Sequence, residues 1–286
     1  MDPLTSIFTL LVLLVTFVLI TVVAQFLRRQ RRLRLALRPI AAYRSMPILV
    51  SEAVESERPV HISFGGSGLG LESTISALAV ADLMYPLVER ASVARQTPLI
   101  TLSDPTALGL AQGTLIRAYR RRETLGAYRS PAVRWYPQGP RSLAFAAGVG
   151  GALADEDANM SVVGGRFGPE IAFIGEAAYR YDQTFFAQSD DLDGQAIAWV
   201  MAGRPLLGEE LYVAGAYLPA RPSALHLSQL LAMDGLRLLV VVAILLVAAF
   251  TAIREYFVQI AIGLGLIILL IGVYYGLMFL RARRRA

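Results

Sequence analysis

The segment HISFGGSGLGLEST, residues 61–74, places closely spaced glycines between an apolar run and a helix-like stretch. Glycine-rich turns of this kind often bind anions, because unpaired backbone N–H groups and the positive end of a helix dipole meet there. The dinucleotide motif G-x-G-x-x-G is not completed, since its last position falls on Leu71 or Ser73. The segment therefore predicts a loop that could hold a small anionic ligand, with candidate residues Gly65, Gly66, Ser67 and Gly68.

A second glycine-bearing turn, GGRFGPE, covers residues 164–170. It combines a flexible backbone, the Arg166 guanidinium and the start of a helix near Pro169, which suits a carboxylate or a phosphate. The alternative is a plain turn, in which the glycines supply positive φ angles and Glu170 favours the helix dipole. The candidate ligand-binding residues here are Gly165, Arg166 and Glu170.

Acidic side chains follow two other strand-like runs. Asp104 stands where dinucleotide-binding folds place a ribose-binding acid, although it lies farther from the glycines than the usual ~20 residues. The favoured interpretation of Asp104 is an N-cap before Pro105, and it is also kept as a candidate ligand residue. Asp190, Asp191 and Asp193 could hold Mg²⁺, but a capping loop is favoured, so no metal site is predicted.

Composition excludes much catalytic chemistry. The chain has no cysteine and no lysine, so all 27 cationic side chains are arginine. Thiolate chemistry, a Walker-type lysine and a Schiff base are therefore excluded. His61 lies in an apolar run and is interpreted as a neutral core histidine, far in sequence from His226. We assign no catalytic residue and leave the cofactor open.

A basic cluster, Arg120 to Arg122, stands at the end of a helix-like run. Cations at helix C-termini are favourable on their own, and no nucleic-acid motif accompanies these arginines. We therefore expect no nucleic-acid partner.

Five strand-like runs alternate with helix-like runs and would carry all these loops. The strand-like runs are residues 59–64, 98–102, 132–137, 159–164 and 183–188. Repeated βα units predict an α/β fold, a Rossmann-like parallel sheet with helices on both faces, in one domain over residues 58–220. Pro86 is expected to kink or break the first of these helices.

Apolar runs at both ends predict a membrane protein, in agreement with a mean hydropathy of +0.52. Residues 4–26, 238–253 and 256–280 suggest three transmembrane helices, one N-terminal and two in a C-terminal hairpin. Arginines follow the first run, so the N-terminus is expected outside and the main domain in the cytoplasm, at a bacterial inner membrane. The predicted segments are 1–27 (first span), 28–57 (basic connector), 58–220 (domain), 221–237 (amphipathic helix) and 238–286 (hairpin and basic tail).

The chain resembles a family of bacterial membrane-anchored proteins defined by a domain of unknown function. The likeness lies in ERPVHISFGGSGLGLESTISALA, TPLITLSDPTALGLAQGTLIRAY, SLAFAAG and VVGGRFGPEIAFIGEAA. The resemblance implies an α/β cytoplasmic domain carried on membrane helices, and it assigns no reaction.

Two hypotheses for function remain. The first is a membrane-tethered, non-catalytic binding or assembly module that contacts the lipid bilayer and associates with copies of itself. The second is a membrane-bound enzyme or sensor that acts on a nucleotide or another phosphorylated molecule. A transporter or channel is less favoured, because the predicted spans have charged residues only at their edges.

Overall fold

The computed structural model describes residues 38–70, 72–129, 132–138, 142–219, 223 and 225–245, and isolated positions in the hydrophobic ends. Those positions are 14, 17, 18, 21, 22, 25, 248, 249, 251, 264, 266, 267 and 271. The chain divides into two compact units, residues 20–230 and residues 1–19 with 231–286. Apart from isolated positions, the predicted spans 4–26 and 256–280 lie outside the described residues.

The first unit contains a five-stranded parallel sheet in the order β3-β2-β1-β4-β5. The strands are β1 (Val60–Gly65), β2 (Leu99–Leu102), β3 (Val133–Trp135), β4 (Met160–Arg166) and β5 (Thr184–Ala187). β1 is buried along its whole length, as expected for the central strand of a sheet that is covered on both faces. The predicted α/β fold with a Rossmann-like parallel sheet is confirmed.

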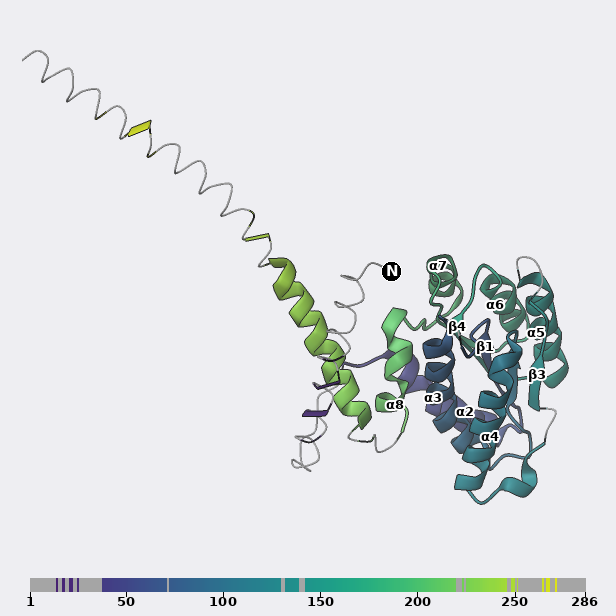
Figure 1. The fold of residues 1–286 in the computed structure, drawn as a ribbon. Helices are drawn as coiled ribbons and strands as arrows, with labels where there is room; N and C mark the ends of the chain where they lie inside the picture. The colour runs from purple at the N-terminus through teal and green to yellow at the C-terminus, as the bar shows by residue number, and fades with distance from the viewer. Residues whose placement is uncertain are drawn as a thin grey trace, which may run out of the picture. The chain divides into compact units, whose positions relative to one another are not determined.

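Helices cover the two faces of this sheet (Figure 1). One face carries α2 (Ala41–Glu55), α3 (Thr74–Ala91) and α4 (Leu108–Arg121), and α3 contacts both of the others. The other face carries α5 (Leu143–Glu156), α6 (Ile171–Arg180) and α7 (Leu192–Met201), with α6 between its neighbours. Short 3₁₀ turns, η1 (Pro105–Ala107), η2 (Leu125–Ala127) and η5 (Gly208–Val213), and the short helix α8 (Ala214–Tyr217) complete the unit.

Two local predictions need correction. The segment 28–57 was expected to be a connector, but α2 lies within it and belongs to the domain core. Its buried side chains, Tyr43, Met46 and Val50 among them, recur at the three- and four-residue spacing of a helix face. Of the kink or break expected at Pro86, the break is wrong, because α3 continues through Pro86 to Ala91. Packing along α3, from Val80 to Val88, holds the helix together although the proline removes one internal hydrogen bond.

One described helix, Leu225–Leu245, is long and apolar enough to cross a membrane, judged by length and composition. It runs without a break through the boundary expected at residue 237, between the amphipathic helix and the second span. Of the three predicted transmembrane helices, the described residues support only this one.

A buried polar chain crosses the middle of the sheet at His61. The His61 Nδ1 atom lies 2.7 Å from Ser161 Oγ on β4, and Nε2 lies 2.8 Å from Thr101 Oγ1 on β2. The Thr101 hydroxyl donates in turn to Ser63 Oγ at 2.8 Å. Burial lowers the pKa of His61 from 6.5 to about 3. The predicted neutral core histidine is confirmed.

The depressed pKa predicts that the domain loses stability in acid. Unfolded chains bind a proton at His61 near pH 6.5, whereas the folded chain resists protonation until about pH 3. The free energy of unfolding should therefore fall as the pH drops through this window, by up to about 1.4 kcal/mol per pH unit. His61→Gln should remove that slope in urea unfolding of the detergent-solubilised chain, followed by tryptophan fluorescence. An unchanged slope in His61→Gln would contradict the prediction, and His226→Gln, which removes the other histidine, is the control.

Candidate functional site

The strand order creates a crevice between β1 and β4. The chain leaves β1 towards α3 on one face of the sheet and leaves β4 towards α6 on the other. Loops that separate in this way open a gap outside the carboxyl ends of the two strands, where open α/β sheets usually bind ligands. The two glycine-bearing turns predicted from the sequence are the loops on either side of this gap.

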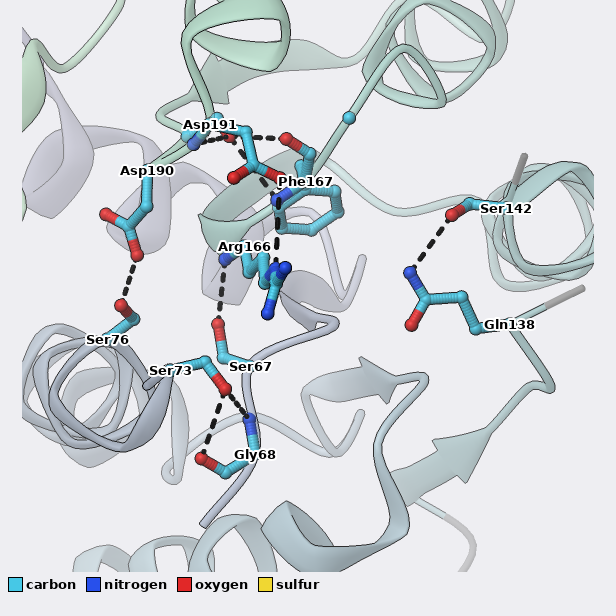
Figure 2. Close-up of polar contacts among 12 residues, drawn as sticks. Ser67, Gly68, Ser73, Ser76, Gln138, Ser142, Arg166, Phe167, Asp190 and Asp191 are labelled. Carbon is cyan, nitrogen blue, oxygen red and sulfur yellow. Dashed lines mark hydrogen bonds and ion pairs between the residues drawn. The ribbon is translucent and has the colours of Figure 1, made fainter. Parts of the chain in front are cut away.

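The two loops are bonded directly to each other. β4 contains an extra residue near its end, because Ser63 pairs with Val163 but Gly65 pairs with Arg166. Gly165 lies in this bulge with φ +104°, a left-handed conformation that suits glycine. The Arg166 backbone N–H donates to Ser67 Oγ at 2.8 Å (Figure 2). The Arg166 carbonyl accepts from the Gly66 N–H at 2.9 Å. We call this set of bonds the β1–β4 clamp.

The backbone N–H groups of the first loop are all paired within the protein. Gly66 donates to the Arg166 carbonyl at 2.9 Å, and Ser67 donates to the Phe64 carbonyl at 3.0 Å. The next three N–H groups bond to hydroxyl oxygens: Gly68 to Ser73 at 3.0 Å, Leu69 to Thr106 at 2.8 Å and Gly70 to Thr74 at 2.9 Å. An anion cradle requires unpaired N–H groups. Residues 66–70 therefore shape one wall of the crevice but offer no free donor to a phosphate.

A cavity of about 440 Å³ opens beside the β1–β4 clamp. This volume falls within the range of small-molecule sites, roughly 300–1,000 Å³. The lining residues come from the loops that follow all five strands: Gly66, Ser73, Asp104, Gln138, Ser142, Arg166, Gly168, Pro169, Glu170 and Asp191. The cavity is thus built by the whole carboxyl edge of the sheet.

The polar groups of the cavity differ in how firmly they are held. The Gln138 amide donates to Ser142 Oγ at 3.1 Å, on the side of the close-up away from Asp190 (Figure 2). Glu170 as a residue is only 3% exposed, and its Oε1 accepts from the Gly168 N–H at 2.9 Å. The Arg166 side chain is half exposed, and its Nε lies 3.9 Å from Asp191 Oδ2. Arg166 and Asp191 could therefore move to meet a ligand, whereas Gln138 is also held at its Oε1 by the Ser103 hydroxyl at 3.3 Å.

The eight candidate residues from the sequence fall into two groups. Four of them line the cavity: Gly66, Asp104, Arg166 and Glu170. The other four lie behind it: Gly65, Ser67, Gly68 and Gly165. A Cβ atom at Gly65 would meet the Phe167 ring, and at Gly68 it would meet the Asp104 carboxylate. The three glycines among them, Gly65, Gly68 and Gly165, leave no room for a side chain beside their neighbours.

The acidic residues have structural bonds. Asp104 Oδ1 accepts from the Thr106 N–H at 2.9 Å and caps η1 with Pro105 in its first turn, so the predicted N-cap is confirmed. The Asp190 carboxylate accepts from Ser76, Gln188 and Tyr212. Burial, with a contribution from Asp190, raises the pKa of Tyr212. No cluster of acidic and histidine residues suited to a metal is found in the described part of the chain.

Several lining residues were not predicted. Ser73, Gln138 and Ser142 each follow a strand, and that position was their only signal in the sequence. Gln138 reaches the crevice because β3 lies beside β2, which no local pattern specifies. Asp191 had been considered only as a metal ligand or cap. It is the N-cap residue of α7, but its side chain makes no capping hydrogen bond and faces the cavity.

Comparison with protein families identifies the chain. Residues 4–262 match the family described as a domain of unknown function, DUF6754. Because the match covers most of the chain, the protein belongs to this family. A comparison with curated proteins and one with solved structures each gave no match.

The β1–β4 clamp predicts opposite outcomes for two glycine substitutions. A Cβ atom at Gly165 would collide with Ser67 Oγ and would have to adopt φ +104°, so Gly165→Ala should lower the free energy of unfolding by about 1–3 kcal/mol. Gly113 lies in α4 with no atom near its Cβ position, so Gly113→Ala should leave stability unchanged or raise it by up to about 1 kcal/mol. Urea unfolding in detergent measures both. Equal changes in the free energy of unfolding for the two variants would contradict the close contact of the two loops at Gly165.

Proposed function

We propose that the protein is a membrane-tethered binding module whose α/β domain holds a small polar ligand in the crevice beside the β1–β4 clamp. The observation that carries this proposal is the position of the 440 Å³ cavity at the point where the strand order reverses. Such a site is assembled from several loops, so a ligand there bonds to segments that are far apart in sequence. Binding would therefore stabilise the domain as a whole.

Binding is favoured over catalysis because two of the three carboxylates that line the crevice, Asp104 and Glu170, already hold loop N–H groups. Asp104 Oδ1 accepts two hydrogen bonds from Thr106, and Glu170 holds the Gly168 N–H. His61 is bonded on both ring nitrogens inside the sheet. The alternative, an enzyme or sensor for a nucleotide or another phosphorylated molecule, would need phosphate donors other than the N–H groups of residues 66–70.

The proposed setting is a bacterial inner membrane, with the N-terminus outside and the domain in the cytoplasm. The arginines after the first apolar run and the apolar helix Leu225–Leu245 support this setting. Three transmembrane helices and self-association in the bilayer belong to the same proposal, because tethered copies meet at high effective concentration.

Ligand binding is tested by melting the full chain in mild detergent with a panel of amines, sugars, nucleosides and nucleotides. A ligand that prefers the folded state should raise the melting temperature. Gln138→Ala should weaken the shift, because it removes a side chain from the cavity wall. Phe173→Ala, an exposed change on α6 outside the cavity, should leave the shift unchanged. A melting-temperature shift that is kept in Gln138→Ala but lost in Phe173→Ala would place the site elsewhere. Chemical conversion of the ligand during incubation would favour an enzyme.

The orientation is tested with a single introduced cysteine, since the chain has none of its own. Ala127 lies on the exposed surface of η2 in the domain. In intact cells, Ala127→Cys should resist a thiol reagent that cannot cross the membrane, and it should react after the cells are opened. Labelling in intact cells would place the domain outside.

A further inference from the structure

We propose that the crevice binds a small organic cation, a ligand that carries a protonated amine. This inference rests on the proposed binding function of the same crevice and adds the chemical class of its ligand. Three observations carry it: the charges around the cavity, the half-satisfied carboxylate of Glu170, and the pairing of the loop N–H groups.

The charged residues that line the cavity are mostly acidic. Asp104, Glu170 and Asp191 contribute carboxylates, and Arg166 contributes one guanidinium. The guanidinium already lies 3.9 Å from an Asp191 oxygen, so part of its charge is matched within the protein. The described lining therefore carries an excess of two negative charges. A cavity with this balance attracts cations and repels phosphates.

One oxygen of the Glu170 carboxylate has no hydrogen-bond donor among the described residues. The residue is 3% exposed, and a buried carboxylate is costly unless it is paired and hydrogen-bonded. Oε1 accepts from the Gly168 N–H, whereas Oε2 accepts from no residue in the described part of the chain. Because a carboxylate can accept about four hydrogen bonds, Glu170 has capacity for a ligand donor. An ammonium group supplies three N–H donors and the opposite charge.

The same features disfavour an anion and an inorganic cation. A phosphate would find one cationic partner in the described lining, Arg166, whose Nε already lies 3.9 Å from an Asp191 oxygen. The N–H groups of residues 66–70 are bonded within the protein and add no donor. Mg²⁺ would need clustered oxygen ligands, and the described residues contain no group of acids arranged for a metal. The carboxylates instead come from three loops around a cavity of about 440 Å³, which suits a molecule larger than one ion.

Charged thiol reagents can measure the electrostatic potential in the cavity directly. Gln138 is exposed and lines the cavity, and the native chain has no cysteine, so Gln138→Cys adds one reporter. Its reaction rates with a cationic and an anionic methanethiosulfonate are compared, in the full chain in detergent, with the rates of a free thiol. Relative to the free thiol, the cationic reagent should be favoured roughly tenfold, as expected for a cleft potential near one kT.

Charge-removing variants locate the source of this preference. In the Gln138→Cys background, Glu170→Gln and Asp191→Asn should each lower the cation-to-anion rate ratio at least about twofold. Asp191→Asn is the safer variant, because its side chain makes no capping hydrogen bond. Glu176→Gln removes the same charge from α6, where Glu176 pairs with Arg180 outside the cavity, and should leave the ratio unchanged. Equal effects of all three variants would overturn the proposal.

Protection of the introduced thiol identifies the ligand class. Putrescine, at millimolar concentration to offset the loss of the Gln138 amide, should slow the reaction of Gln138→Cys, whereas Mg²⁺ and inorganic phosphate should not. Protection by Mg²⁺ alone would overturn the amine in favour of a metal. Protection by phosphate, together with a rate ratio that favours the anionic reagent, would overturn the organic-cation proposal. The crevice would then remain a binding site, but for an anion. Both proposals would be removed by three results together. The cation-to-anion rate ratio of Gln138→Cys would equal that of a free thiol, no probe would protect the thiol, and no ligand of the panel would shift the melting temperature.

Discussion

The structure depends on two loop backbones that must pass within hydrogen-bonding distance of each other. The loops after β1 and β4 start on adjacent strands and diverge to opposite faces of the sheet. They can stay together only where no side chain intervenes, which explains Gly65 and Gly165. The Arg166 peptide then bonds to Gly66 and Ser67 on both its N–H and its carbonyl sides. This contact fixes the crevice wall and aims the Arg166 side chain at the cavity.

The β1–β4 clamp also shows that glycines of the segment 61–74 serve contacts within the protein. Glycines in a strand-to-helix turn allow a backbone to approach something closely, and either a ligand or another loop can be that neighbour. Here the neighbours of Gly65, Gly68 and Gly165 are Phe167, Asp104 and Ser67. Hydroxyl groups of Ser73, Thr74 and Thr106 then take the remaining loop N–H groups. The loop N–H groups are thus used within the protein, and of the charged side chains that line the cavity three are acidic and one is basic.

Much of the fold could be predicted from the sequence because each buried strand is a short apolar run followed by a turn. The Asp104 cap could also be predicted, because it depends on the neighbouring Pro105. The neutral state of His61 could be predicted from the apolar run in which it lies. Helix α2 was missed because Pro47 and the flanking charges obscured its apolar face. Gln138 and Ser142 could not be assigned to the site, because their place in it depends on the order of the strands. The sequence could not show whether residues 66–70 bind a ligand or contact another loop, because that depends on which atom accepts the hydrogen bond of each backbone N–H group.

Hydrogen exchange at the amides of residues 66–70 tests the central claim most directly. All five amides should exchange more slowly than in an unstructured peptide, because each is bonded within the protein. The buried Ser67 and Gly68 amides should be better protected than the amide of the exposed Gly70. Adding inorganic phosphate should not slow them further. Exchange at the rate of an unstructured peptide, followed by protection when phosphate is added, would contradict the account and restore the loop as an anion cradle.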